Sequence, residues 1–226
     1  MEPVRIPRRA TWSFFEDLAE AASSMAHGHD PLDPMSLQRG NWQTVIHRDV
    51  KPVNIFFGLP RTPGKRGIPE LKVGDFGLAV PHNYKENPEQ IVGVGTATYR
   101  APEQSANALN HRPVHKLSSA TDVWAVGRIT LLLVELSSPR PGEVFYGKTY
   151  QGKVQHAPEK EQRLKLYGGK LYELIENCLE PVPDDRTTAS LLLKSIREYL
   201  DDDREGPPPR LEEDDSLQYT ADLVWS

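Results

Sequence analysis

The sequence of 226 residues predicts a mainly α-helical domain in which short β-hairpins flank one polar loop. Apolar residues recur at three- and four-residue steps over 11–27, which is the period of a helix packed on one face. A strongly apolar helix is expected over 119–136, and two or three short helices over 160–194. Short strand-like runs border the polar loop within 46–57, which reads I-H-R-D-V-K-P-V-N-I-F-F.

The first helix is expected over Thr11–His27, where Phe14 and Leu18 fall on one face. Ser13 and Glu16 have the spacing of a capping box, in which each side chain satisfies a backbone amide at the helix start. This pattern predicts a core helix that begins close to Thr11.

Composition divides the chain into three segments. Residues 1–10 are rich in Pro and Arg and are expected to be irregular, residues 11–200 form the folded unit, and residues 201–226 form a tail. The tail holds nine acidic and two basic residues and few apolar ones, which predicts disorder. Cys178 is the single cysteine and lies in a helical pattern, so we expect a small core residue rather than a reactive thiol.

The polar loop carries groups suited to phosphoryl transfer. His47-Arg48-Asp49 is followed, after four residues, by Asn54. Phosphoryl transfer requires a carboxylate beside the attacking hydroxyl and an oxygen ligand for Mg²⁺, and Asp49 and Asn54 suit these two tasks. Lys51 lies between them, where its ammonium group can neutralise charge on the transferred phosphate.

Two further motifs follow in order. Asp75-Phe76-Gly77 comes after a short apolar run at 71–74 that predicts a strand, so a second carboxylate lies on a turn suited to Mg²⁺. An insertion at 58–69 lengthens the spacing between the two motifs, at modest entropic cost. The segment 95–103 then reads G-T-A-T-Y-R-A-P-E.

With these motifs in this order, residues 11–200 resemble the large, C-terminal lobe of eukaryotic protein kinases. The lysine in H-R-D-V-K-P-V-N is typical of the serine/threonine kinases. The resemblance implies the kinase C-lobe fold, ATP and Mg²⁺ as cofactors, and a protein Ser or Thr hydroxyl as acceptor. It assigns catalysis to Asp49, Lys51 and Thr96. Nucleotide binding falls to Lys51, Asn54, Phe56 and Asp75, of which Asn54 and Asp75 would hold metal.

The resemblance also assigns structural and regulatory roles. His47 and Phe76 match the lower members of the hydrophobic stack that aligns active kinases, and Gly77 completes the second metal-binding motif. Asp122 is expected to accept hydrogen bonds from the catalytic-loop backbone, although a lone Asp at a helix start is ordinarily a cap. Arg186 is expected to form a buried ion pair with Glu103.

Arg48 precedes the catalytic aspartate, an arrangement that in the family usually receives a phosphate from the activation loop. Residues 78–94 contain neither Ser nor Thr. We therefore expect that the loop needs no Ser/Thr phosphorylation and that Glu86 or Glu89 takes the place of the phosphate beside Arg48.

No glycine-rich loop and no lysine–glutamate pair of the small lobe precede the first helix, so we expect that lobe to be absent from this sequence. The family mechanism requires both the glycine-rich loop and the lysine–glutamate pair. We therefore expect this chain alone to have little or no phosphate-transfer activity. One interpretation is a serine/threonine kinase present as a partial domain. The alternative is an inactive, pseudokinase-like module that binds a protein partner through the surface facing the small lobe. A small-molecule phosphotransferase would leave A-P-E and Arg186 unexplained.

The charge and hydropathy of the sequence argue against two classes of binding partner, nucleic acids and membranes. Outside the acidic tail the chain is close to neutral, which argues against nucleic acid. No apolar run reaches the length of a membrane span, and the first residues lack the apolar core of a signal peptide. One cysteine favours a reducing compartment, so a cytoplasmic or nuclear location is expected.

Overall fold

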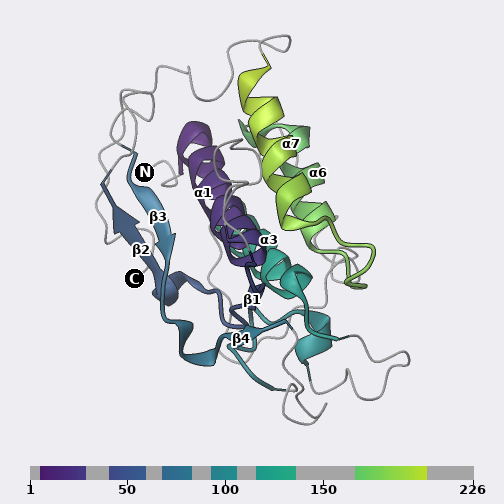
Figure 1. Ribbon diagram of the computed structural model, residues 1–226. Helices are drawn as coiled ribbons and strands as arrows, with labels where there is room; N and C mark the ends of the chain where they lie inside the picture. The colour runs from purple at the N-terminus through teal and green to yellow at the C-terminus, as the bar shows by residue number, and fades with distance from the viewer. Residues whose placement is uncertain are drawn as a thin grey trace.

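The computed structural model describes residues 6–28, 41–59, 68–82, 93–105, 116–135 and 166–202. In this part of the chain the α-helices are α1 (Arg8–His27), α3 (Ser119–Glu135), α6 (Gly169–Cys178) and α7 (Ala189–Asp201). Helix α1, purple in Figure 1, lies between the strands on one side and α7 on the other, and it also packs against α3. The helical core is therefore organised around α1.

Two small antiparallel sheets position the polar turns. Strand β1 (Val45–Ile46) pairs with β4 (Val80–Pro81), and β2 (Ile55–Gly58) pairs with β3 (Glu70–Val73). The chain runs from β1 through the polar loop to β2, and later from β3 through the second polar turn to β4. Because the strands pair at both ends, the two turns must lie side by side.

The predicted start of the first helix is wrong by three residues. Helix α1 begins at Arg8 rather than Thr11, so Ser13 and Glu16 lie inside it and form no capping box. Glu16 instead accepts a hydrogen bond from Nε of Arg197 on α7, at 3.2 Å. The expected irregular segment 1–10 is correspondingly shorter, and its residues 1–5 lie outside the described part of the chain.

Aromatic side chains of α1 pack against α7 on one side and against β2 on the other. The ring of Trp12 stacks on Tyr199 of α7 with centroids 4.6 Å apart, and Phe14 meets Phe57 of β2 edge-on at 6.2 Å. Such pairs contribute about 0.5–1.5 kcal/mol each beyond the area that they bury. These contacts explain why a helix of mixed polarity is buried along most of its length.

Helix α3 is apolar on nearly every side and crosses the centre of the core. Gly127 faces α6, where a Cβ at this position would come within 2.4 Å of the Cβ of Cys178. Cys178 is fully buried, and burial raises the pKa of its thiol. The prediction of a small core cysteine is confirmed.

The described residues confirm a mainly helical fold with short hairpins around the polar loop. Helix α7 ends at Asp201, the first residue of the expected tail, and residues 203–226 lie outside the described part of the chain. No described helix is both long enough and apolar enough to span a bilayer. The expected absence of a small lobe stays a prediction.

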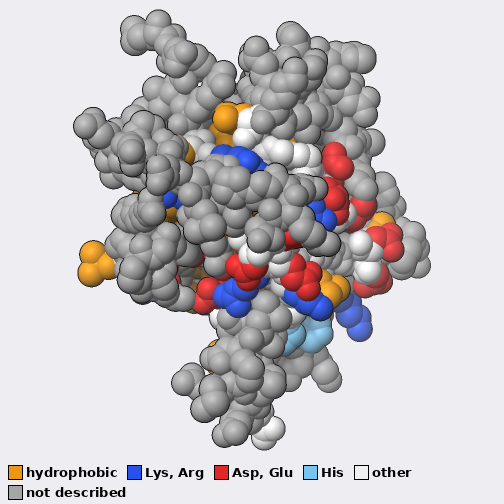
Figure 2. All heavy atoms as spheres, turned by 90° about the horizontal axis from the view of Figure 1, so that it is seen from above, with side chains coloured by type: hydrophobic (Ala, Val, Ile, Leu, Met, Phe, Trp, Pro, Cys, Tyr) orange, Lys and Arg blue, Asp and Glu red, His pale blue; other side chains and the backbone are white. Residues whose placement is uncertain are grey.

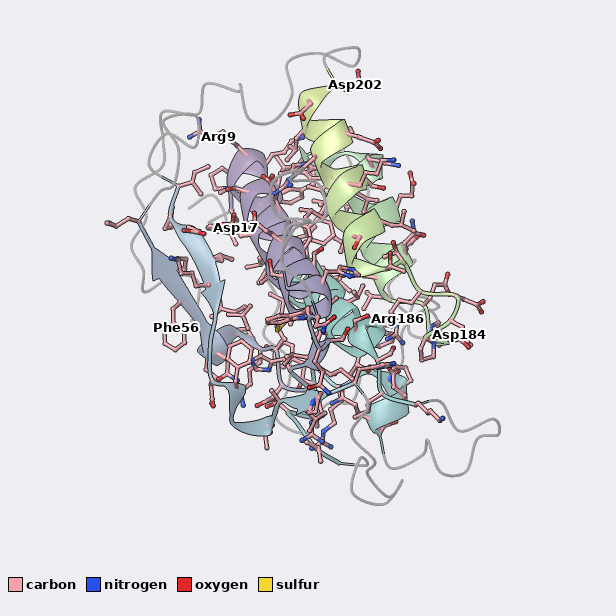
Figure 3. All side chains as sticks on the ribbon, viewed as in Figure 1. Arg9, Asp17, Phe56, Asp184, Arg186 and Asp202 are labelled. Atoms are coloured by element: carbon pink, nitrogen blue, oxygen red, sulfur yellow. The ribbon has the colours of Figure 1, made fainter. Side chains whose placement is uncertain are left out.

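An ion pair between Arg186 and Glu103 ties the turn before α7 to the A-P-E segment. Both side chains are fully buried, with N–O distances of 3.0 and 3.1 Å. The Thr121 hydroxyl donates to the same carboxylate at 2.9 Å, and the Arg186 guanidinium lies 5.0 Å from the Trp124 ring centroid. Figure 3 shows Arg186 beyond the lower end of α7, close to α3.

Removing one partner of this pair should destabilise the whole lobe. Arg186→Ala leaves the Glu103 carboxylate buried without its guanidinium, and we expect the free energy of unfolding to fall by about 3–5 kcal/mol. Urea denaturation followed by circular dichroism measures the change.

Lys194→Ala is the matched control, because Lys194 and Glu198 form an exposed pair 3.7 Å apart on α7. Loss of an exposed pair should change the free energy of unfolding by less than about 0.5 kcal/mol. Equal effects of the two substitutions would contradict the buried pair's structural role.

Candidate active site

Asp122, in the first turn of α3, holds the start of the polar loop. Its Oδ2 accepts from the backbone N–H of His47 at 2.8 Å, and its Oδ1 accepts from that of Arg48 at 3.0 Å. These are the backbone contacts that the resemblance to the kinase C-lobe implied for Asp122. Because the carboxylate is buried, desolvation raises its pKa to about 6, while the two backbone hydrogen bonds oppose this shift.

Arg48 has an unusual backbone conformation, with φ of +69°. A non-glycine residue in the left-handed region costs about 1–2 kcal/mol, so surrounding contacts must hold it. Its N–H is held by Asp122 and its C=O accepts from Nε2 of Gln104 at 2.9 Å. The side-chain Nε donates to the Leu78 carbonyl at 2.5 Å.

The expected pairing of Arg48 with an acidic residue of the activation loop lies outside the described part of the chain. Glu86 and Glu89 both fall within residues 83–92, which the structure does not describe. The expectation that the loop needs no Ser/Thr phosphorylation stays a prediction.

Asp49 of the polar loop forms one polar cluster with the side chains of Thr96 and Lys51. Oδ1 of Asp49 accepts from both the backbone N–H and the hydroxyl of Thr96, each at 2.8 Å. Oδ2 of Asp49 lies 2.7 Å from Nζ of Lys51, which also donates to the Thr96 hydroxyl at 2.9 Å. The Asp49 carboxylate is thus held in one direction by Thr96 and has the ammonium group of Lys51 beside it.

The two residues expected to hold metal lie on adjoining turns. Nδ2 of Asn54 donates to the backbone carbonyl of Asp49 at 2.9 Å, and the Asn54 carbonyl accepts from Gly74 N–H at 2.8 Å. Asp75 follows Gly74 directly, has φ of +59°, and accepts from Gly77 N–H at 3.3 Å. Its carboxylate is exposed.

This donor set fits Mg²⁺ carried by a nucleotide. Mg²⁺ often binds only one or two protein oxygens and takes its other ligands from phosphate and water, and Asn54 and Asp75 offer donors of this kind. No group of three or more His, Cys, Asp or Glu side chains among the described residues could hold a metal. The oxygen chemistry of Asn54 and Asp75 suits Mg²⁺ that brings its remaining ligands from a nucleotide and water.

Exposed apolar side chains border the polar turns. Phe56, labelled in Figure 3, is 56% exposed and covers Gly74, where an added Cβ would come within 2.7 Å of its ring. Phe76 is 50% exposed and packs on the His47 ring with centroids 4.8 Å apart. Nε2 of His47 lies 2.9 Å from the Gly74 carbonyl, which joins the two turns. The turns and their apolar border form one surface.

Two residues of this site were missed or undervalued by sequence reasoning. The sequence assigned no site role to Gly95, yet with φ of +86° it lies against the polar loop, and a Cβ there would come within 2.4 Å of the Arg48 carbonyl oxygen. Gln104 follows A-P-E and is almost fully buried, although no motif marks it. The Gly95 carbonyl accepts from the guanidinium of Arg100, and burial lowers the pKa of Arg100.

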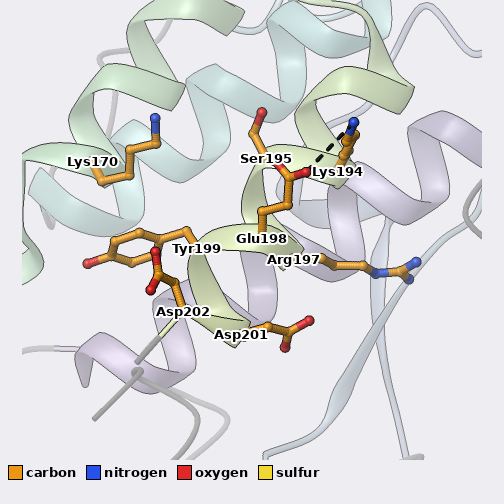
Figure 4. Close-up of a pocket in the computed structure, with 8 residues that line it drawn as sticks. All are labelled: Lys170, Lys194, Ser195, Arg197, Glu198, Tyr199, Asp201 and Asp202. Atoms are coloured by element: carbon orange, nitrogen blue, oxygen red, sulfur yellow. Dashed lines mark ion pairs between the residues drawn. The ribbon is translucent and has the colours of Figure 1, made fainter. Parts of the chain in front are cut away.

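A separate hollow of about 870 Å³ lies on α6 and α7 and contains none of these residues. Figure 4 shows its basic and acidic side chains close together, including the Lys194–Glu198 ion pair. The charged residues that line it balance in number: Lys170, Lys194, Arg197, Glu198, Asp201 and Asp202. Size alone does not make it the functional site, because its residues offer no catalytic pair and no net charge.

Charges of both signs also mix elsewhere on the surface. On the face shown in Figure 2, described acidic and basic side chains lie side by side instead of forming a patch of one sign. This mixture agrees with the near-neutral charge expected outside the tail.

The family model of the protein kinase domain matches residues 41–196, which include every predicted site residue. The chain belongs to the protein kinase family, and the predicted resemblance is confirmed.

The curated relatives include proteins named as G2-specific protein kinases and as serine/threonine-protein kinases. The G2-specific protein kinase nim-1 of Neurospora crassa is 28% identical over 199 residues, covering 80% of this chain and 20% of that protein. The G2-specific protein kinase nimA of Emericella nidulans is 28% identical over 202 residues, covering 81% and 25%. The serine/threonine-protein kinase PkaA of Streptomyces coelicolor is 34% identical over 153 residues, covering 68% and 25%. The chain thus spans a fifth to a quarter of the length of these relatives.

The pH dependence of stability should reveal whether burial or hydrogen bonding dominates at Asp122. Burial raises its pKa from 3.8 to about 6, so the folded state binds the proton more tightly than the unfolded chain between these values. The contribution of Asp122 to the free energy of unfolding should therefore decrease, by about 1–3 kcal/mol, as the pH rises through this window.

Asp122→Asn removes this titration, so the difference between wild type and variant should shrink as the pH rises from about 4 to 7. Urea denaturation at each pH measures it. A difference that grows with pH would show that the two backbone hydrogen bonds keep the carboxylate charged.

A pair of glycine substitutions tests the contact of Gly95 with the catalytic loop. Gly93 and Gly95 have φ of +83° and +86°, but a Cβ at Gly93 meets nothing within 4 Å. Both alanine variants incur the cost of the left-handed backbone, about 1–2 kcal/mol, and only Gly95→Ala also displaces the Arg48 carbonyl. We expect Gly95→Ala to lower the midpoint of urea unfolding clearly more than Gly93→Ala, and equal midpoints would contradict the contact.

Proposed function

We propose that this lobe carries the catalytic groups of a serine/threonine protein kinase, which transfers the γ-phosphoryl group of ATP to a protein Ser or Thr hydroxyl. The observation that carries the proposal is the fixed carboxylate of Asp49, held by Thr96 on one oxygen and by Lys51 on the other. This is the arrangement that orients a hydroxyl for attack. The names of the serine/threonine kinase relatives support the choice of acceptor.

In the proposed reaction the substrate hydroxyl oxygen forms a bond to the γ-phosphorus as the bond to the β,γ-bridging oxygen breaks and ADP leaves. Asp49 orients the hydroxyl and takes up its proton. Lys51 lies 2.7 Å from Asp49 and stabilises negative charge on the phosphoryl oxygens. Asn54 and Asp75 would hold Mg²⁺, which neutralises phosphate charge when bound. Phe56 offers its exposed ring to the adenine.

Asp49→Asn tests the central assignment. The amide keeps the size of the side chain but cannot take up the proton, so phosphate transfer should fall by at least about a hundredfold while ATP binding stays within about twofold. A radiolabelled ATP assay with a Ser/Thr peptide measures transfer, and calorimetry measures binding. Asp184→Asn, on an exposed turn, is the charge-matched control and should leave both unchanged. Full turnover by Asp49→Asn would refute the assignment.

Thr96→Ser and Thr96→Val separate the hydroxyl from the rest of the side chain. Serine keeps the hydroxyl that donates to Asp49 and accepts from Lys51, so kcat should stay within about threefold of wild type. Valine keeps the shape and loses the hydroxyl, so kcat should fall by about ten- to a hundredfold. Equal kcat values for the two variants would show that the hydroxyl has no part in catalysis.

These assays should use the native protein captured through an antibody against the acidic tail, because the chain spans only part of its relatives' length. The mass of the captured species reports whether the native protein is heavier than this chain. A heavier, active species supports a kinase that includes a small lobe.

A second candidate function is protein binding without catalysis. One observation favours it: apolar side chains around the site are exposed, including Val53 at 73%, Phe56 at 56% and Phe76 at 50%. A native protein of the same mass as this chain, without transfer activity but with a partner that Val53→Asp releases, would support this candidate over the kinase.

A further inference from the structure

We propose that Gln104 is a positioning residue for Asp49, an assignment that rests on the proposed kinase function and deepens it. Its carboxamide fixes the peptide bond between Arg48 and Asp49 and also fixes the segment that carries Thr96. Gln104 would thereby set the direction of the Asp49 carboxylate from both sides, although it touches neither substrate nor nucleotide.

The Gln104 side chain is 2% exposed and forms hydrogen bonds through both ends of its carboxamide. Oε1 accepts from the backbone N–H of Ala101 at 3.0 Å. Nε2 donates to the Arg48 carbonyl at 2.9 Å and to the Val94 carbonyl at 3.3 Å. A carboxamide suits this buried position because it offers an acceptor to the Ala101 amide and a donor to the two carbonyls. An apolar side chain would leave all three backbone groups without these partners.

The hydrogen bond from Gln104 to the Arg48 carbonyl fixes the backbone immediately before Asp49. The Arg48 N–H is held by Asp122, and the Asp49 N–H lies 3.3 Å from Nδ1 of His47. The Arg48 carbonyl, on the far side of the same residue, is held by Gln104. Since Arg48 is in the left-handed region, loss of this bond frees its ψ angle to relax and turns the peptide plane from which the Asp49 side chain extends.

The hydrogen bond from Gln104 to the Val94 carbonyl fixes the segment that carries Thr96, the residue that also orients Asp49. The Gln104 carbonyl accepts from Gly93 N–H at 2.9 Å, and its side chain donates to the Val94 carbonyl. Two residues after Val94, Thr96 donates twice to Oδ1 of Asp49. Gln104 therefore sets the spacing between the loop that carries the carboxylate and the segment that holds it.

The chemistry of the carboxamide allows two different substitutions. Gln104→Met keeps the length and apolar packing and removes every hydrogen bond of the side chain. Gln104→Glu keeps the acceptor for Ala101 but, when ionised, turns an oxygen toward the carbonyls of Arg48 and Val94. A protonated carboxyl can donate to the Arg48 carbonyl again, so the Glu variant should regain function as the pH falls.

The experiment compares both variants with wild type in the native protein, using steady-state kinetics with ATP and a Ser/Thr peptide. We expect Gln104→Met to lower kcat by about tenfold or more and to change KM for ATP by less than about twofold, because only the orientation of Asp49 is altered. Gln104→Glu should be as impaired as Met at about pH 8 and recover several-fold at about pH 6 relative to wild type at the same pH.

Amide hydrogen exchange gives a readout that does not depend on activity. Exchange should accelerate in the peptide that contains Arg48 and Asp49 and in the one that contains Thr96, while α1 and α3 keep the wild-type rates. Ser105→Ala is the matched control: it removes the 2.7 Å bond from the Ser105 hydroxyl to the Pro102 carbonyl in the same turn, away from the catalytic loop. It should change neither kcat nor exchange.

The outcomes separate this proposal from the kinase function itself. Unchanged kcat and unchanged exchange in Gln104→Met would overturn the positioning role. Faster exchange spread evenly over the core would overturn it too, because that result defines a packing residue. If wild type transfers no phosphate but exchange around Arg48 responds selectively in both variants, the kinase proposal fails and the structural link from Gln104 to Asp49 stands.

Discussion

The rest of the site depends on one buried carboxylate, that of Asp122. Its two oxygens lie inside the core and accept hydrogen bonds from two consecutive backbone amides of the polar loop, those of His47 and Arg48. Burying those amides without acceptors would cost about 1–3 kcal/mol each. Once they are held, Arg48 keeps its left-handed backbone, and Asp49 leaves the loop in one direction. Helix α3, which packs in the core, thus also fixes the backbone of the polar loop.

The fold was predictable where sequence and structure share a local pattern. Helix α3 and the strands that border the polar loop follow from apolar periodicity and β-branched runs. The start of α1 did not follow, because tertiary contacts fix it: Arg8 donates to the Tyr199 hydroxyl at 2.9 Å, and the Tyr167 hydroxyl donates to the Ile6 carbonyl at 2.8 Å. These partners lie more than 150 residues away, and no local pattern announces them.

The residues of the candidate site likewise fall into those that the sequence could predict and those that it could not. Asp49, Asn54 and Asp75 could be proposed from the sequence because phosphoryl transfer requires particular side chains at particular spacings. Gln104 could not be predicted, because its side chain binds backbone carbonyls. Every residue has such a carbonyl, so the contact requires no particular residue type at the partner position. Gly95 belongs to the same class, since what it avoids is the Arg48 carbonyl. Side chains that recognise backbone become visible only when the chain has folded.

The ion pair of Glu103 and Arg186 joins residues 83 positions apart, and this separation has a consequence for synthesis. A ribosome makes the polar loop, both hairpins and the A-P-E turn well before Arg186 leaves the exit tunnel. Until then, the carboxylate of Glu103 cannot be buried at an acceptable cost. Burial of the Glu103 carboxylate can therefore be completed only after the 83 residues up to Arg186 have been synthesised, so this contact forms later than the two hairpins that precede it.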